Sequence, residues 1–334
     1  MKYVLELDGL RGAAILSVMA FHLGLFPIGW IGVPLFFVLS GYLITSILIG
    51  ARRGTLKAYL IGFYWRRTLR IFPLYYAYLL VNALLTLKAG LSVSGYGWFV
   101  AYLGNYRIAA LAPTVPGGII GHLWSLAVEE QFYLLWPLAI FFIRRMWIVA
   151  AVAIILAPVV REILLFSTGN SYLAILTLPS CMDMLAAGAL VALVENRRLL
   201  TMMGSSGFAI CVWCLWKVPI ADFSSVPLWV PQAHIMFTGL ALLFAPLVKG
   251  AAHIKLLGNP QLVWVGKISY GLYMWHMLAF AAVNKMHLPY GVHEAVGLML
   301  AFGAATLSWY LFEKPILKMK ALVPGNPAHG AANG

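Results

Sequence analysis

Residues 7–26 read LDGLRGAAILSVMAFHLGLF, an apolar run whose ionisable side chains are Asp8, Arg11 and His22. A helix of this length rises about 30 Å, which matches the hydrocarbon core of a bilayer. Arg11 and His22 are eleven positions apart, so on a helix they share one face at depths that differ by roughly 16 Å. Ionisable groups inside a membrane cost free energy and usually mark a polar pathway or a reaction site. The segment therefore predicts a first membrane span that takes part in chemistry.

The rest of the chain has the same membrane character. Its 334 residues are 63% hydrophobic and 10% charged, with a mean hydropathy of +0.90, which excludes a soluble globular domain. The apolar stretches have the length of spanning helices and lack the strict alternation of an outer-membrane barrel. We therefore predict an all-α, polytopic membrane protein with about ten transmembrane helices.

Hydropathy and charge clusters predict where the spans lie. They are expected near 9–26, 31–50, 71–88, 122–143, 147–166, 175–194, 203–219, 227–247, 264–283 and 290–313. Residues 54–69 mix aromatics with cations and predict an interfacial cytoplasmic helix, whereas 95–112 predict a re-entrant or interfacial piece on the outer side. We expect one membrane-embedded domain over 1–320 and a disordered Pro/Gly/Ala-rich tail over 321–334.

The basic residues indicate the orientation. Sixteen of the 23 fall in the segments that lie inside if the N-terminus is cytoplasmic. The outer loops hold Arg107, with Lys88, Lys217 and Lys285 near their edges. The positive-inside rule then predicts that both termini are cytoplasmic. It also accounts for the net charge of +13 without a nucleic-acid partner.

The cysteines do not indicate a redox or metal site. Cys181, Cys211 and Cys214 all lie in apolar segments, and the last two form a C-x-x-C without a soluble redox fold around it. We interpret them as packing residues. We expect no metal and no permanently bound cofactor.

Five blocks carry a resemblance to a known family. In order they are LDGLRGAAILSVMAFH (7–22), GVPLFFVLSGYLI (32–44), RTLRIFPLYY (67–76), HLWSLAVEEQFYLLWP (122–137) and ISYGLYMWH (268–276). Their order and spacing over roughly 5–315 resemble the acyltransferase-3 family of integral membrane O-acyltransferases. The resemblance implies transfer of an acyl group, commonly acetyl from cytoplasmic acetyl-CoA, to a hydroxyl of a carbohydrate, a lipid-linked glycan or a small molecule.

Arg11 and His22 are the candidate anchor and base. An imidazole exchanges protons near neutral pH and can deprotonate an acceptor hydroxyl. A guanidinium can hold an anionic part of the donor or orient a carboxylate. From the residues alone, a structural role is equally plausible, with Arg11 snorkelling beside Asp8 and His22 hydrogen-bonded at the outer rim. The resemblance, in which this Arg and His are the signature pair, favours the functional interpretation.

Four further residues are candidates for donor binding. Arg67 and Arg70 share a helical face, and a guanidinium pair suits the phosphates of coenzyme A, although from the residues alone ordinary positive-inside anchoring is the favoured explanation. Ser40 and Tyr42 flank a glycine in the second span, where helix packing is the ordinary role. The resemblance implies that both pairs contact or position the donor. We do not expect an acyl-serine, because there is no nucleophile elbow.

Glu129 and Glu130 are the candidate carboxylates. Side by side on a helix, they point about 100° apart, so at most one faces a given site squarely. One of them can orient His22, as a carboxylate does in other histidine-based acyl transfer. The alternative is that they pair with buried cations such as Arg11 or Arg161. We expect Glu129 to face the site and Glu130 to support it.

Several other polar residues lie in apolar segments. Arg161, Glu162 and Asp183 fit structural ion pairing better than an acceptor cavity. His276 belongs to the last block, and a polar packing role and a catalytic role are equally compatible with its position.

The sequence therefore predicts an O-acyltransferase of the bacterial inner (cytoplasmic) membrane. Acyl-CoA is the expected donor, an envelope carbohydrate or lipid-linked glycan the expected acceptor, and lipids surround the spans. We expect no appended extracytoplasmic hydrolase-like domain of the kind that some relatives carry, and we expect another protein to supply any second step outside. Two alternatives stay open: acylation of a small secondary metabolite, and a proton- or anion-coupled secondary transporter. Against the transporter, no inverted repeat of Gly/Pro-broken helices is visible.

Overall fold

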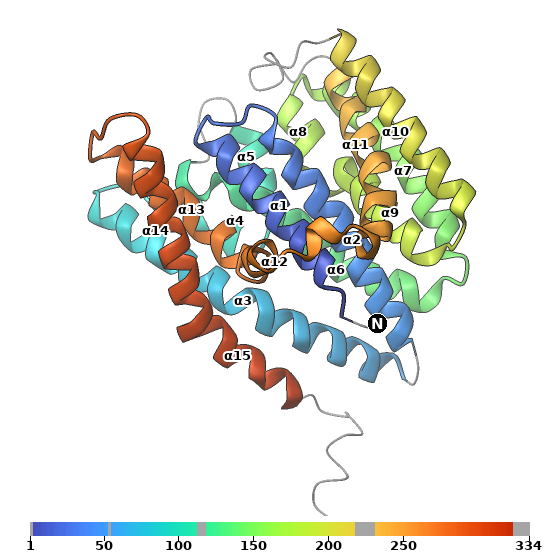
Figure 1. Cartoon of the computed structure of the whole chain (residues 1–334), viewed down its shortest axis with the longest axis horizontal. Helices are drawn as coiled ribbons and strands as arrows, with labels where there is room; N and C mark the ends of the chain where they lie inside the picture. Colours follow the sequence, from blue (N-terminus) through green and yellow to red (C-terminus); the bar gives the residue numbers. More distant parts are fainter. Residues whose placement is uncertain (1–2, 53–54, 112–117, 218–230, 323–334) are drawn as a thin grey trace, which may run out of the picture.

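The computed structural model describes residues 3–52, 55–111, 118–217 and 231–322, and these residues contain helices and turns but no β-strand. The helices of eight or more residues are α1 (Leu5–His22), α2 (Gly32–Ala51), α3 (Leu56–Lys88), α5 (Gly104–Leu111), α6 (Trp124–Phe142), α7 (Met146–Thr168), α9 (Leu178–Leu193), α10 (Arg197–Lys217), α11 (Pro231–Gly250), α12 (Pro260–Lys267), α13 (Ser269–Asn284) and α14 (Val292–Ser308). Figure 1 shows α1 and α2 near the middle of the bundle, with α7, α10 and α11 towards one end and α14 towards the other.

The predicted spans coincide with helices. Seven helical segments in the described ranges are long and apolar enough to cross a membrane, and they contain α2, α3, α7, α9, α10, α11 and α14. The windows 9–26, 122–143 and 264–283 coincide with α1, α6 and the pair α12–α13. Charged residues lower the mean hydropathy of α1 and α6, and a break at Ile268 divides the third window into two helices. The prediction of an all-α, multi-pass membrane protein is confirmed.

One predicted boundary is wrong. Residues 54–69 and 71–88 were expected to form an interfacial helix followed by a span, but α3 is one helix of 33 residues that continues through Pro73. The side chain of Thr55 caps its start by accepting a hydrogen bond from the Ala58 amide at 3.3 Å. Membrane helices tolerate an internal proline because neighbouring groups satisfy the freed backbone atoms. The arginines that suggested an interface point instead into a cavity within the protein.

The segment expected not to span is formed by short helices. α4 (Tyr96–Val100) and α5 have 5 and 8 residues, too few to cross a bilayer. They are held against α6, where the Gln131 amide donates to the Tyr102 carbonyl at 2.8 Å and to the Asn105 side chain at 3.0 Å. The absence of a span here agrees with the prediction, and the outer location stays a prediction. The predicted disordered tail lies, from residue 323 onward, outside the described residues.

Glycines bring helix backbones into contact at the centre. A Cβ atom on Gly41 of α2 would overlap the Leu185 carbonyl of α9, and one on Gly188 would overlap the Val38 carbonyl. In the same way, Gly12 of α1 faces the backbone of α12. Small residues are the usual means of close helix approach in membranes. The predicted packing role of Gly41 is confirmed, and these contacts fix α1 and α2 beside the site.

A buried ion pair ties α7 to α9. The Arg161 guanidinium lies 2.5 Å from the Asp183 carboxylate, with side-chain exposures of 1% and 0%. Thr238 of α11 donates to the same carboxylate at 2.6 Å. Glu162 pairs with His234 at 2.9 Å. The predicted structural role of these residues is confirmed. All three cysteines are buried, and none forms a disulfide in the part of the chain described.

Candidate active site

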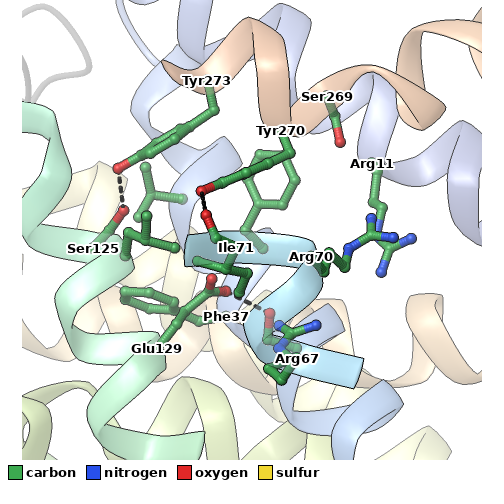
Figure 2. Close-up of a pocket in the computed structure, with 14 residues that line it drawn as sticks. Arg11, Phe37, Arg67, Arg70, Ile71, Ser125, Glu129, Ser269, Tyr270 and Tyr273 are labelled. Carbon is green, nitrogen blue, oxygen red and sulfur yellow. Dashed lines mark hydrogen bonds between the residues drawn. The ribbon is translucent and has the colours of Figure 1, made fainter. Parts of the chain in front are cut away.

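A cavity opens between α1, α2, α3, α6 and α13. Its empty space of about 700 Å³ includes the part that is open to the outside. The polar side chains that line it are Arg11, Ser40, Arg67, Arg70, Ser125, Glu129, Ser269, Tyr270 and Tyr273. Figure 2 shows the arginines on one side of this space and Ser125 with Tyr273 on the other. The five blocks that supply these residues are distant in sequence and meet here.

Three arginines form the basic side of the cavity. Arg11 is paired with Asp8 at 2.9 Å, as one of the sequence-based alternatives anticipated. The Arg67 guanidinium carbon lies 4.0 Å from the centroid of the Tyr133 ring, a cation–π contact. Within the described ranges, neither Arg67 nor Arg70 has a carboxylate at ion-pair distance. Half-buried guanidinium groups without a carboxylate partner are suited to an anionic ligand.

A second cavity continues the first towards the chain termini. It shares Arg11, Ser40, Arg67 and Arg70 with the first cavity and adds Arg66 and Lys320 at its mouth. Lys320 comes from the terminal turn η7 (Met319–Leu322), which packs against α3. Burial and then the neighbouring arginines lower the pKa of Lys320 to about 8. The cavity is therefore a basic channel that begins at the side where α1 starts and the described chain ends.

Ser40 and Glu129 join α2 to α6 at the wall of the channel. The Ser40 hydroxyl donates a hydrogen bond to the Glu129 carboxylate. Glu130 lies outside the two cavities, and its Oε1 is buried without a hydrogen-bond partner among the described residues. Glu129 thus faces the site, as expected. Its recorded partner, however, is Ser40 and not His22.

Tyr273 of α13 lines the cavity and contacts α6 and the turn before it. The Tyr273 hydroxyl donates its proton to the His122 carbonyl. In the contact of 2.9 Å between Tyr273 and Ser125 Oγ, the serine hydroxyl is therefore the donor. The His122 ring packs 5.0 Å from the Tyr273 ring. Tyr270, one turn earlier on the same face of α13, donates to the Ile71 carbonyl at 2.7 Å. These contacts fix the face of α13 that borders the cavity.

His22 lines neither cavity and contacts a second histidine. Its Nδ1 is 3.0 Å from Nε2 of His276, and the ring centroids are 5.0 Å apart. His22 is the last residue of α1 and is exposed, whereas His276 is fully buried. His276 also contacts the backbone of Tyr273, at 2.9 Å. It therefore lies between the cavity wall and His22, and the expected carboxylate partner of His22 is replaced by an imidazole.

The structure brings most of the predicted site residues together. Arg11, Ser40, Arg67, Arg70 and Glu129 line one cavity. Their roles stay predictions.

Tyr42 was expected to contact the donor, but it is not among the residues lining either cavity and its ring faces Lys249 at 5.9 Å. Tyr270, Tyr273 and Lys320 were missed. The first two are three apart, and His276 follows at the same interval, so a shared helical face was a readable signal. Lys320 had no such signal.

Comparison with known proteins identifies a family whose model matches most of the chain. The family model described as "Acyltransferase domain" (Acyl_transf_3) matches residues 4–314. The O-acetyltransferase OatA of Staphylococcus aureus is 28% identical over 368 aligned positions, covering 95% of this chain and 58% of that protein.

Two further relatives have names that mention peptidoglycan. The putative peptidoglycan O-acetyltransferase YrhL of Bacillus subtilis is 29% identical, with 94% of this chain and 55% of that protein covered. The peptidoglycan O-acetyltransferase OatA of Listeria monocytogenes is 27% identical, with 95% and 56% covered. The chain thus spans little more than half the length of these relatives. No solved structure matches it.

Proposed function

The chain belongs to the acyltransferase-3 family, and we propose that it is a membrane O-acyltransferase that moves an acyl group, most simply acetyl, from acyl-CoA to a hydroxyl of an envelope carbohydrate. The observation that carries the proposal is the basic channel, in which Arg67 and Arg70 have no carboxylate partner in the described ranges, together with the His22–His276 pair, which contacts the backbone of the cavity residue Tyr273. Neither feature alone specifies acyl transfer. Together they provide an anion-binding entrance and a base at its far end.

The basic channel fits the donor. Coenzyme A carries phosphate groups, and Arg67, Arg70 and Lys320 present cations to one space. A donor held there by its phosphates has to extend its thioester by about 16 Å to reach the depth of His22, given the helical rise from Arg11. An acyl-CoA with an extended arm fits such a path, and a compact anion does not. For the thioester to pass, the contact between Tyr273 and Ser125 opens.

His22 is the proposed general base. It takes the proton from the acceptor hydroxyl as that oxygen attacks the thioester carbonyl. The new C–O bond forms, the C–S bond breaks, and the coenzyme A thiolate takes the proton back from the His22 imidazolium, so the products are the ester, free coenzyme A and neutral His22. The exposure of His22 supports an acceptor that arrives at its end of α1.

The acceptor and location follow from the relatives and the charge pattern. Two relatives are named peptidoglycan O-acetyltransferases, which supports an envelope glycan as acceptor. The excess of cations beside the start of α1 supports a cytoplasmic donor side, with both termini in the cytoplasm. The membrane is then the bacterial inner membrane.

The test is acetyl transfer by the purified protein in nanodiscs, with acetyl-CoA and muropeptides, followed as coenzyme A thiol release and as glycan ester. Loss of a general base should lower kcat of His22→Ala by about 10²–10⁴-fold. Loss of a charged contact should raise the donor KM of Arg70→Gln by about tenfold or more. The controls are His253→Ala and Arg52→Gln, because both residues are exposed and line neither cavity.

Three outcomes would contradict the proposal. Unchanged turnover in His22→Ala would remove His22 from the chemistry. Transfer to small hydroxylated metabolites but not to glycans would favour a metabolite-tailoring enzyme. Absence of transfer, together with solute flux in proteoliposomes, would favour a transporter.

A further inference from the structure

The buried histidine beside His22 has one determined proton position. Nδ1 of His276 lies 3.0 Å from the Leu272 carbonyl oxygen and 2.9 Å from the Tyr273 carbonyl oxygen. Carbonyl oxygens only accept hydrogen bonds, so this nitrogen is the donor and carries the proton. In a neutral imidazole the other nitrogen is then an acceptor. Nε2 of His276 therefore presents a lone pair.

That lone pair determines the proton position on His22. The partner of His276 Nε2 is His22 Nδ1, at 3.0 Å. Since the first atom accepts, His22 donates from Nδ1, and its own Nε2 is left without a proton. The two rings are nearly parallel, with an interplanar angle of 30°, and the inner ring is fully buried while the outer ring is exposed. The buried His276 imidazole thus sets the tautomer of the exposed His22 imidazole.

We propose that His276 is a positioning residue that holds His22 as the Nδ1–H tautomer, with Nε2 free to accept the proton of the acceptor hydroxyl. This inference rests on the proposed assignment of His22 as the base. In other histidine-based acyl transfer a carboxylate holds the imidazole in the required tautomer. Here a neutral imidazole, anchored to the backbone of α13, takes that place.

Among the residues that the structure describes, no charged group competes for this hydrogen bond of His276. The rings packed against it are His22, His122 at 5.2 Å, Tyr273 at 6.2 Å and Phe280 at 5.7 Å between centroids. No carboxylate is recorded as a partner of either His22 or His276 in the described ranges. The tautomer of His22 therefore depends on His276, and removal of this side chain leaves the proton position unspecified.

The test has a spectroscopic and a kinetic part. Protein labelled with ¹⁵N-histidine in liposomes reports by NMR which ring nitrogens carry protons, and the signals of His22 are those lost in His22→Gln. The expected wild-type spectrum has a protonated Nδ1 and an unprotonated Nε2 on His22. In His276→Leu we expect that pattern to be lost and kcat to fall about 10- to 100-fold, because the base is no longer held in the required tautomer, with the donor KM unchanged.

His276→Gln is the matched variant, because its amide oxygen can accept from His22 where leucine cannot. It should restore the His22 tautomer and part of kcat. A wild-type His22 protonated on Nε2 would overturn the proposal, as would a His276→Leu protein with unchanged tautomer and kcat. If His276→Leu does not fold, the wild-type spectrum still decides. Full turnover in His22→Ala would instead contradict the proposed base, whatever the spectrum shows.

Discussion

Donor binding should weaken about tenfold between pH 7 and pH 9 because Lys320 loses its charge in that window. Lys320 lines the mouth of the basic channel beside Arg66, Arg67 and Arg70. Burial and then the positive neighbours lower its pKa from 10.5 to about 8. An ordinary lysine would keep its charge throughout this range.

The magnitude follows from the protonated fraction. With a pKa of about 8, Lys320 is about nine-tenths charged at pH 7 and about one-tenth charged at pH 9. A charge-assisted hydrogen bond to a phosphate contributes about 1.5–3 kcal/mol, so the charged form binds the donor more than tenfold better. The affinity for the donor therefore falls nearly in proportion to the fraction of Lys320 that is still charged. A phosphate monoester, with a second pKa of about 6, stays fully ionised over the same range.

The assay is calorimetric titration of coenzyme A into the protein in nanodiscs at pH 7, 8 and 9. Lys320→Arg should abolish the pH dependence and keep the tight binding, because arginine stays charged. Lys320→Met should also abolish the dependence, at the weaker affinity. An equal slope in the wild type and in Lys320→Arg would refute the assignment of Lys320 to the donor phosphates.

Three further predictions concern the fold and the wall of the channel. Asp183→Ala leaves the Arg161 charge buried and unpaired, so unfolding measured by steric trapping should become easier by about 3–5 kcal/mol; a double change to leucine at both positions should cost less than this single change. Gly41→Val should abolish folded protein in fluorescence size-exclusion chromatography because its side chain meets the backbone of α9, whereas Gly50→Val, which faces open space, should not. Ser40→Ala removes the hydrogen bond to the carboxylate on α6 and should lower kcat about 10- to 100-fold in the transfer assay; turnover equal to that of the wild type would remove this contact from the mechanism.

The sequence determines the spans well because burial in lipid leaves a strong composition signal. In the described ranges, each of the ten predicted windows coincides with one or two helices. The failure at α3 has a physical cause: Arg66 and Arg67 were interpreted as signs of an interfacial helix, whereas both line a cavity inside the protein. Hydropathy cannot distinguish a cation that faces the membrane surface from one that faces an internal polar channel.

Most residues of the site could be predicted from the sequence, but the contacts between them could not. Glu129 faces the cavity as expected, yet its partner is Ser40, 89 positions away in the chain. His22 contacts His276, at a separation of 254 positions, and the sequence left the role of His276 open. Contacts between helices depend on rotation and depth, which are set by glycine pairs such as Gly41 and Gly188. A single sequence shows that these residues are present but does not indicate which of them are in contact.

The most direct test of the account is the sidedness of the reaction in proteoliposomes. Acetyl-CoA is sealed inside, the glycan acceptor is supplied outside, and protease cleavage of a C-terminal tag gives the fraction of protein whose Lys320 side faces the lumen. We predict that acetylated glycan appears outside in proportion to that fraction, and that no product forms when donor and acceptor are both on the His22 side. Product that forms when both substrates are confined to the Lys320 side would contradict transfer across the membrane.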